Sequence, residues 1–412
     1  MSAVVDLPVT PRYRDFKVKT VVDESLREGL ERCMFPVSID DLYRLFLAQV
    51  DAGIRDTIVG AGPADLELLT RILEEQDKGN VPADVRPIFL VLLNCWDATY
   101  KNFKKLPRAW IERTIFSYGM VEHKRDEKLF ERVFEKFANL GAKNFKSSVL
   151  NNFSRGFTEE KYADMTWQIE WGYQLGIKAF RINDSVGKIY PEDVSVLCAR
   201  LVKEFPDITF CLHCHNDRDL ALANQLTSIA YGFQAVEGSL CGFGNRSGIT
   251  PLEILASICE DKGIQLGDVP INVKTLCQNA LLAEEIYMAV PNTYRPFSGR
   301  FVMKANFGVL NIPDFLGAEG ERDYFLNLVN IHPNTILRAL RAGGFRHEEL
   351  TDQLVQEVMA RLPDIIQERH AEARVTYDRV SRDMLNFYAR SQLSTSDIVH
   401  IARQLRGRRP AA

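Results

Sequence analysis

The feature that most constrains this 412-residue chain is a regular alternation of short β-rich runs with longer helical patterns between about residues 17 and 265. Strands that alternate with helices form parallel βαβ units, and eight such units can close into a barrel. We therefore predict an α/β protein built on a (β/α)8 TIM barrel. The eight strand candidates cover residues 18–23, 55–60, 85–93, 111–116, 142–149, 177–183, 208–216 and 233–240.

The alternation ends near residue 275. Residues 291–320 are rich in Pro, Gly, Asn and Phe without a clear period, and helical patterns follow as far as about residue 406. Long irregular stretches inside a compact chain are usually functional loops or linkers. We expect three parts, which are a catalytic barrel over residues 1–275, an irregular linker or lid over residues 276–330, and a small helical C-terminal domain over residues 331–412.

The charge and apolar content of the chain limit the kinds of partner that it can bind. The chain carries 51 basic and 55 acidic residues, for a net charge of −4, and this argues against binding nucleic acid or a membrane surface, since both need a basic excess or patch. No apolar run approaches the roughly 20 residues of a membrane span, and the N-terminus lacks a signal-peptide pattern. The eight cysteines show no zinc spacing. We expect reduced thiols in a cytoplasmic protein.

Polar clusters follow four of the strand candidates. The active groups of a β/α barrel lie at the C-terminal ends of its strands, so these clusters are expected to share one mouth of the barrel. They are D-E-S-L-R-E-G at residues 23–29, N-D-S-V-G at residues 183–187, H-C-H-N-D at residues 213–217 and G-F-G-N-R-S-G at residues 242–248.

His213 and His215 are the strongest pair of candidates. Residues two apart on a strand face the same way, and two imidazoles with one carboxylate form a facial ligand set that leaves positions open for water or substrate. Asp23 and Glu28 are the carboxylate candidates. The alternative is a strand with two structural histidines, but the acids and Arg27 at another strand end favour a metal site.

Arg27 is the second candidate. A guanidinium beside a metal can hold a substrate carboxylate or stabilise an enolate oxygen, and the alternative is a structural partner for Asp23 or Asp184. We expect Asp184 to orient other groups of the site from behind. The glycine-rich run at residues 242–248 is not a dinucleotide fingerprint, because its spacing differs and it follows the last strand.

Together these motifs resemble the metal-dependent barrel superfamily of 2-isopropylmalate synthase, homocitrate synthase, citramalate synthase and hydroxymethylglutaryl-CoA lyase. The family opening D-x-T-L-R-[DE]-G matches residues 23–29, D-T-V-G matches residues 184–187, H-x-H-N-D matches residues 213–217, and G-x-G-[EN]-R-x-G matches residues 242–248. The acid in L-R-E-G and the run at residues 248–252 are most similar to homocitrate synthase. Ile249 stands where isopropylmalate synthase has an Asn ligand, and it cannot coordinate.

The resemblance implies a site and an activity. Glu28, His213 and His215 would hold one divalent metal (Mg, Mn or Zn), with Arg27 catalytic. The implied reaction is a Claisen condensation of an acyl-CoA, usually acetyl-CoA, with a small-molecule 2-oxo acid, and thioester hydrolysis follows. The C-terminal extension, which the short lyase lacks, favours the synthases. Implied substrate contacts come from Arg27, Asp23, Ser185 and Thr250, and implied supporting residues are Asp184, Asn216, Asp217, Asn245 and Arg246.

The chain departs from the synthases at the residues that move protons. Asn151 stands at the position of their strand 5 loop Glu, Gly308 at the position of their linker His, and Glu31 at the position of their Gln. Neither Asn151 nor Gly308 can act as a general base near neutral pH. His332 and Tyr324, which lie in the extension, are the replacement candidates.

Three interpretations remain open on the sequence. The first is acyl-CoA condensation with an unusual 2-oxo acid. The second is a metal-dependent aldolase or lyase that acts on a 2-oxo acid without CoA, which would explain the missing His and Glu. The third is a catalytically degenerate homologue that binds metal, and the retained Arg27 and ligand residues argue against it. Resemblance to the synthases also implies a homodimer in which the C-terminal segment is exchanged.

Overall fold

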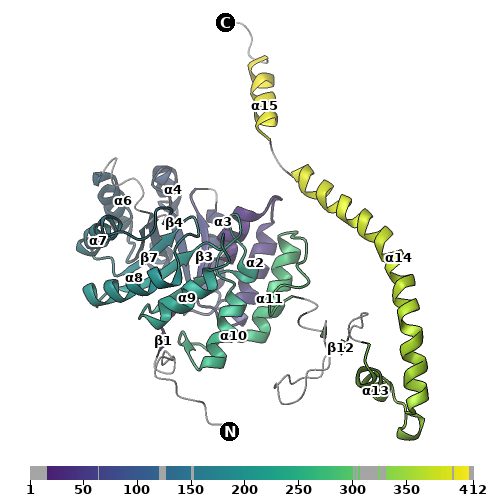
Figure 1. The fold of residues 1–412 in the computed structure, drawn as a ribbon. Coiled ribbons are helices and arrows are strands. Elements are labelled where there is room, and N and C mark those ends of the chain that lie inside the picture. Colours follow the sequence, from purple (N-terminus) through teal and green to yellow (C-terminus); the bar gives the residue numbers. More distant parts are fainter. Residues whose placement is uncertain are drawn as a thin grey trace. The chain divides into compact units, whose positions relative to one another are not determined.

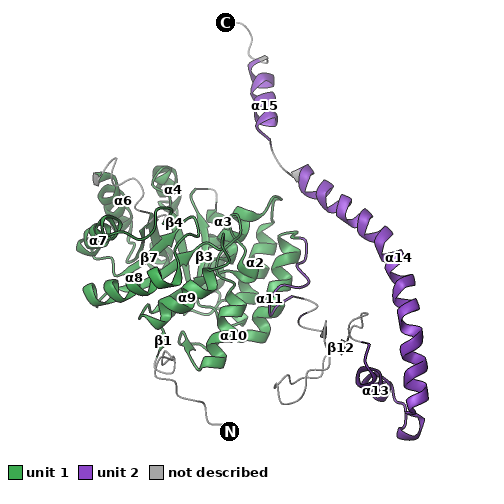
Figure 2. Ribbon diagram, viewed as in Figure 1, with its two compact units in different colours: residues 1–289 green, residues 290–412 purple. Residues whose placement is uncertain are grey.

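The computed structural model describes residues 16–63, 65–119, 127–149, 153–299, 302, 305–306, 323–324, 331–391 and 394–407. The chain divides into two compact units, residues 1–289 and residues 290–412 (Figure 2). The first unit contains the barrel and the candidate site. The second is largely helical.

Unit 1 is built around a closed barrel of parallel strands, as predicted (Figure 1). Each strand pairs with its neighbour in chain order, and β9 closes the barrel by pairing with β2. The strands are β2 (Thr20–Asp23), β3 (Asp56–Ala61), β4 (Arg86–Val91), β5 (Ile115–Gly119), β6 (Asn144–Val149), β7 (Ala179–Asp184), β8 (Thr209–Cys214) and β9 (Ala235–Gly238).

Helices surround the barrel and cover its outer face (Figure 1). They are α1 (Ser25–Arg32), α2 (Ile39–Asp51), α3 (Leu66–Asp77), α4 (Trp96–Phe103), α5 (Arg108–Arg113), α6 (Glu127–Leu140), α7 (Glu159–Gln174), α8 (Pro191–Glu204), α9 (Ala221–Ala230), α10 (Leu252–Lys262) and α11 (Val273–Ile286). Outside the barrel, β1 (Lys17–Val18) pairs in parallel with β10 (Gln265–Leu266).

The alternation of side chains along each strand separates two apolar regions. A small cluster of Val22, Ile58, Ile88 and Leu90 forms inside the barrel, while the opposite faces of the strands pack with the helices in one large core. Polar side chains cap the first turn of several helices. The Ser38 hydroxyl accepts from the Asp41 amide at the start of α2, which satisfies a donor that the helix itself leaves free.

The predicted strand over residues 111–116 is wrong in its first half. Residues up to Arg113 belong to α5, the backbone turns extended at Thr114, and β5 begins at Ile115. The buried side chain of Ile111 therefore belongs to a helix and not to a strand. The physical reason is that a six-residue segment is too short for the spacing of its apolar residues to distinguish a strand from a helix.

Unit 2 confirms the predicted helical C-terminal region. It contains α13 (Pro333–Ala342), α14 (Asp352–Ser391) and α15 (Thr395–Gly407), with the short parallel pair β11 (Ala305–Asn306) and β12 (Asp323–Tyr324). The predicted end of the barrel at residue 275 falls inside helix α11. The whole of this helix lies within unit 1. Throughout the described chain, every helix is too short or too polar to cross a membrane.

Candidate metal centre

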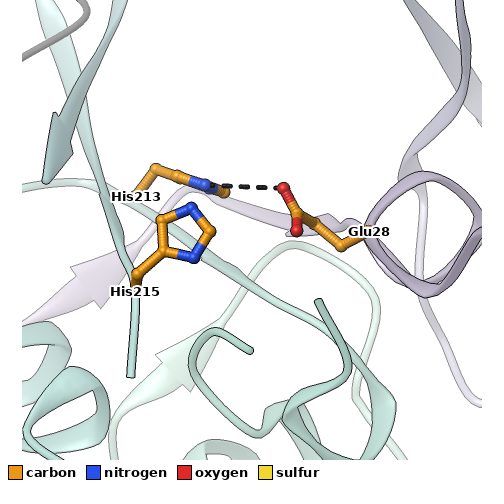
Figure 3. A group of neighbouring side chains, drawn as sticks. All are labelled: Glu28, His213 and His215. Carbon is orange, nitrogen blue, oxygen red and sulfur yellow. Dashed lines mark ion pairs between the residues drawn. The ribbon is translucent and has the colours of Figure 1, made fainter. Parts of the chain in front are cut away.

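The three predicted metal ligands lie together at the C-terminal mouth of the barrel. His213 lies in β8, His215 follows the last residue of that strand, and Glu28 lies in the first turn of α1. All three are buried, and one potential ligand atom from each lies within 4.8 Å of the others. His213 Nε2 is 3.7 Å from Glu28 Oε1, and Figure 3 shows the Glu28 carboxylate directed toward the two rings. This set can hold one cation.

His213 is in a form that suits ligation. Burial, reinforced by the positive charge of Arg181, holds the pKa of His213 well below its usual range. The imidazole is therefore neutral at physiological pH, which is the form that binds metals. Nδ1 of His215 is buried and has no hydrogen-bond partner among the described residues.

Backbone from the glycine-rich loop fixes Glu28. The Asn245 amide donates to Glu28 Oε2 at 3.0 Å, and the Asn245 side chain donates to Glu31. A Cβ on Gly244 would lie 2.7 Å from the same Glu28 oxygen, so only glycine allows this approach. The loop after β9 thus supports a candidate ligand that comes from α1.

Arg27 lies among three carboxylates. Its Nε donates to Glu24 at 2.6 Å and its Nη1 to Glu31 at 2.7 Å, while its Nη2 donates to Glu28. Burial alone would lower the pKa of Arg27, but the charges of Glu24, Glu28 and Glu31 outweigh it and raise that pKa. The side chain is 12% exposed, so a fixed cation lies beside the candidate ligand set at the edge of solvent.

Three further predicted supporting residues, Arg246, Asp217 and Asn216, hold the loops around the mouth. Arg246 makes a forked ion pair with Asp217, with contacts from 2.8 to 3.2 Å, and also donates to the Ser185 carbonyl at 2.8 Å. This connects the loops that follow β7, β8 and β9. The side chain of Asn216 accepts from the Ala221 amide at 3.0 Å, which places it at the start of α9.

Asp184 organises the loop after β7. Its Oδ2 accepts from the amides of Lys188 and Ile189 at 2.5 and 2.8 Å. The carboxylate is therefore used by its own loop. The ion pairs of Arg27 among the described residues are with Glu24, Glu28 and Glu31, so the alternative pairing with Asp184 is not seen there. This arrangement agrees with a supporting role behind the site.

Asp23 and Thr250, two other predicted site residues, use their side chains in contacts within unit 1. The Asp23 carboxylate accepts from the amide and hydroxyl of Ser25, so Glu28 provides the carboxylate of the cluster. The buried Thr250 hydroxyl donates to the Ala221 carbonyl at 3.3 Å. His332 is the N-cap residue of α13 in unit 2. Asn151 and Gly308 lie outside the described residues.

The sequence reasoning missed a group of buried charges inside the barrel, which we call the interior charge cluster and define as Glu24, Lys146, Arg181 and Glu237. Arg181 donates to Glu24, to Glu237 at 2.9 Å and to Ser148 at 3.0 Å. Lys146 Nζ lies 3.8 Å from Glu237. A charged residue within an otherwise apolar buried strand was the available signal, because such strands are normally continuous runs of apolar residues.

The interior charge cluster lies directly behind His213. Nδ1 of His213 is 3.7 Å from Glu24 Oε1 and from Glu237 Oε2. Glu24, His213 and Glu237 could by distance alone form a second metal group. Arg181, however, already pairs with both carboxylates. We therefore interpret this group as an ion-pair network rather than a cation site.

Comparisons with known proteins agree with this fold. The HMGL-like family model matches residues 19–282. The homocitrate synthase of Sulfolobus acidocaldarius is 33% identical over 362 residues, which cover 83% of this chain and 74% of the relative. The 2-isopropylmalate synthase of Sediminispirochaeta smaragdinae is 25% identical over 243 residues, with 57% and 48% covered.

Solved structures show the same fold. A hydroxymethylglutaryl-CoA lyase from Pseudomonas aeruginosa superposes with a TM-score of 0.55 at 16% identity, covering 70% of this chain and 98% of the lyase. The carboxyl transferase domain of Rhizobium etli pyruvate carboxylase gives a TM-score of 0.53 at 13% identity, with 68% and 51% covered. The family model spans more than half of the chain, and this protein therefore belongs to the HMGL-like family.

Proposed function

We propose that this protein is a divalent-metal-dependent enzyme that condenses an acyl-CoA, most simply acetyl-CoA, with a 2-oxo acid. The observation that carries the proposal is the convergence of Glu28, His213 and His215 at the C-terminal mouth, with Arg27 bonded to Glu28. Membership of the HMGL-like family and relatives named homocitrate synthase support this class of chemistry.

The donor set fits a divalent ion. One carboxylate and two imidazoles suit Mg, Mn or Zn, and three protein ligands leave positions for substrate. Nδ1 of His215 is buried and has no partner within the described part of the chain. This supports the assignment, because a buried polar atom without a partner is costly. When bound, such an ion would polarise the keto group of the substrate as a Lewis acid.

Arg27 would offset the charge that develops on the keto oxygen as the new carbon–carbon bond forms. Its guanidinium is fixed by Glu24, Glu28 and Glu31, so little reorganisation is needed during the reaction, and preorganised charge of this kind supplies much of the rate enhancement of many enzymes. Three of its five N–H groups are used in these contacts, which leaves donors for a substrate oxygen.

Proton removal from the acyl donor requires a base. We assign this role to His332, because Asn151 and Gly308 cannot accept a proton near neutral pH. The alternative function, a metal-dependent aldolase or lyase without CoA, is favoured by these same two substitutions.

The test is an assay of free thiol release from acetyl-CoA across a panel of 2-oxo acids, with Mg, Mn or Zn added in turn. Thiol release with any 2-oxo acid supports condensation, since only this reaction frees CoA. Absence of release, together with pyruvate or glyoxylate formed from a hydroxylated 2-oxo acid, would support the aldolase instead.

We also propose a homodimeric and cytoplasmic enzyme. No disulfide joins any of the eight cysteines, all of which lie among the described residues, and this is typical of a reducing compartment. The dimer proposal depends on the C-terminal extension and is tested below.

A further inference from the structure

The N-terminal mouth of the barrel holds a cavity of about 370 Å³. The first residue of every barrel strand lines it, from Thr20 of β2 to Ala235 of β9. The candidate metal ligands follow the opposite, C-terminal ends of the strands. The cavity is therefore a separate feature, which the proposed chemistry does not use.

Small interior side chains leave this space open. The interior of a TIM barrel is ordinarily filled by layers of bulky branched side chains. Here Val22, Ile88 and Ile115 line the cavity, but Thr20, Cys211 and Ala235 line it as well. These three residues do not fill the layer at the N-terminal end.

Lys146, whose ammonium group is buried, is one of the residues that line the cavity. Its side chain is 8% exposed, and its Nζ has no hydrogen-bond partner within the described structure. The Glu237 carboxylate lies 3.8 Å away, which is beyond hydrogen-bond distance. Buried ammonium groups without an acceptor are rare because they are costly in free energy. An acceptor atom supplied by a ligand would therefore stabilise this group.

Asp56 carries a buried acceptor atom that lacks a donor among the described residues. Its Oδ2 accepts from Arg86 at 2.6 Å, but its Oδ1 is buried without a partner in the part of the chain that is described. A ligand that carried both an anionic group and a hydroxyl or amino group would satisfy Lys146 and Asp56 together.

The charge of the lining favours an anion. Four basic side chains, Arg86, Lys143, Lys146 and Lys178, line the cavity with one acidic side chain, Asp56, in a chain whose net charge is −4. Lys143 pairs with Glu112 at 2.9 Å and Arg86 pairs with Asp56. Glu237, 3.8 Å from Lys146, offsets part of the Lys146 charge. The excess positive charge therefore rests mainly on Lys178 at the exposed rim.

We propose that this N-terminal mouth is a second ligand site, which binds a small organic anion through its carboxylate or phosphate group. Lys146 donates to the anionic group, Lys178 attracts it at the entrance, and Asp56 accepts from a hydroxyl or amino group of the same molecule. A volume of about 370 Å³ admits a ligand of metabolite size.

Isothermal titration calorimetry of the full-length, chelator-treated protein tests the site. The probes are malonate, malate and inorganic phosphate, each titrated separately. We expect saturable binding of at least one probe. Lys146→Met should weaken it by at least about tenfold, because a hydrogen bond to a charged group contributes about 1.5–3 kcal/mol. Malate should bind more tightly than malonate, since its hydroxyl can donate to Asp56.

Two controls separate this site from the metal centre. His215→Ala, at the opposite end of the barrel, and Lys101→Met, on exposed α4, should leave the affinity unchanged. Binding that survives Lys146→Met, binding that is lost in His215→Ala, or absence of binding by all three probes would overturn the proposal. Because the metal is removed, these results do not depend on the proposed condensation.

A third variant covers the possibility that Lys146→Met unfolds. Lys178→Met changes an exposed rim residue and should weaken binding several-fold while it leaves the melting temperature unchanged. If neither lysine variant alters the affinity, the anion does not bind at this mouth.

Discussion

At the scale of single residues, the candidate ligands depend on contacts from several loops. Glu28 is fixed by Arg27 and by the Asn245 amide, and His213 has Glu24 and Glu237 behind its Nδ1. His215 has no such partner on its Nδ1 among the described residues. A change at His215 should therefore remove a ligand with little effect on the surrounding contacts.

We predict that His215→Ala lowers the affinity for Mn²⁺ or Zn²⁺ by at least about a hundredfold and leaves folding intact, because one of three protein ligands is lost. Equilibrium dialysis with metal analysis measures the affinity, and thermal unfolding of the metal-free protein checks the fold. His347→Ala, a change in the short 3-10 helix His347–Glu349 of unit 2, is the matched control. Equal metal affinity in His215→Ala would show that the ion binds elsewhere.

We predict that Arg27→Lys removes most of the activity, by about 10²-fold or more in kcat, without unfolding the protein. Lysine keeps the charge but cannot contact Glu24, Glu28 and Glu31 with a planar fork. Steady-state kinetics in the thiol-release assay measure the loss. Turnover equal to that of the parent enzyme would assign Arg27 a purely structural role.

We predict a pH-dependent effect of Asp23 on stability. Burial raises the pKa of Asp23 from 3.8 to about 6, so the folded state binds more protons than the unfolded state between these values. The contribution of Asp23 to the free energy of unfolding should therefore fall as the pH rises from about 4 to about 6, by up to roughly 3 kcal/mol. Asp23→Asn should flatten this fall, because an amide does not ionise.

Urea unfolding of the metal-free protein at several pH values measures this effect. Glu237 does not mask it, because Arg181 and Lys146 outweigh the effect of burial and lower the pKa of Glu237 to about 2. Its contribution is lost only as the pH falls below about 4.5. Parallel curves for Asp23→Asn and the parent protein would contradict the prediction.

At the scale of elements, the loop between β9 and α10 is a structural part of the candidate centre. Gly248 has a φ of +86°, and a Cβ there would lie 1.8 Å from the Gly242 carbonyl oxygen. The Gly248 carbonyl in turn accepts from the Asn216 amide after β8. The loop therefore depends on glycine both for its backbone conformation and for the close approach of two chain segments.

We predict that Gly248→Ala destabilises the protein by several kcal/mol and weakens metal binding, because the clash displaces the loop that holds Glu28. Gly79→Ala is the matched control, since Gly79 has a φ of +77° but an added Cβ would meet no atom within 4 Å. Its cost should be about 1 kcal/mol, from the backbone conformation alone. Urea unfolding compares the two, and similar losses would show that the close contact is unimportant.

At the scale of the whole molecule, unit 2 exposes apolar side chains on long helices. Val375, Tyr377, Val380 and Leu385 of α14 are more than half exposed. Covering these side chains in an interface would remove apolar surface from water, which favours association. They support the proposal that the extension contacts a second copy of the chain.

We predict a homodimer by light scattering, in which the extension of one copy completes the site of the other. Mixing His215→Ala with His332→Ala after mild denaturation and refolding should then restore about a quarter of the parent activity, because half of randomly formed dimers carry one intact composite site. An active monomer, or mixtures as inactive as their components, would contradict this prediction.

Local patterns in the amino-acid sequence were sufficient to predict the eight βα units and the C-terminal mouth. Strand and helix periods depend on neighbours a few residues away, so they can be read locally. The H-x-H pair and L-R-E-G follow strand ends directly, and the topology of a parallel barrel brings such ends to one rim. Local patterns failed where they were ambiguous, as in residues 111–116, which divide between α5 and β5.

Which buried charges meet could be learned only from the folded barrel. Arg181 pairs with Glu24, 157 residues away in sequence, and Lys146 approaches Glu237 across the interior. The fold also determines that Asp23 bonds to Ser25 while Glu28 joins the histidines. The physical reason is that closure of the barrel sets the distances between distant residues, and the strength of a charge interaction depends on distance and burial rather than on position along the chain.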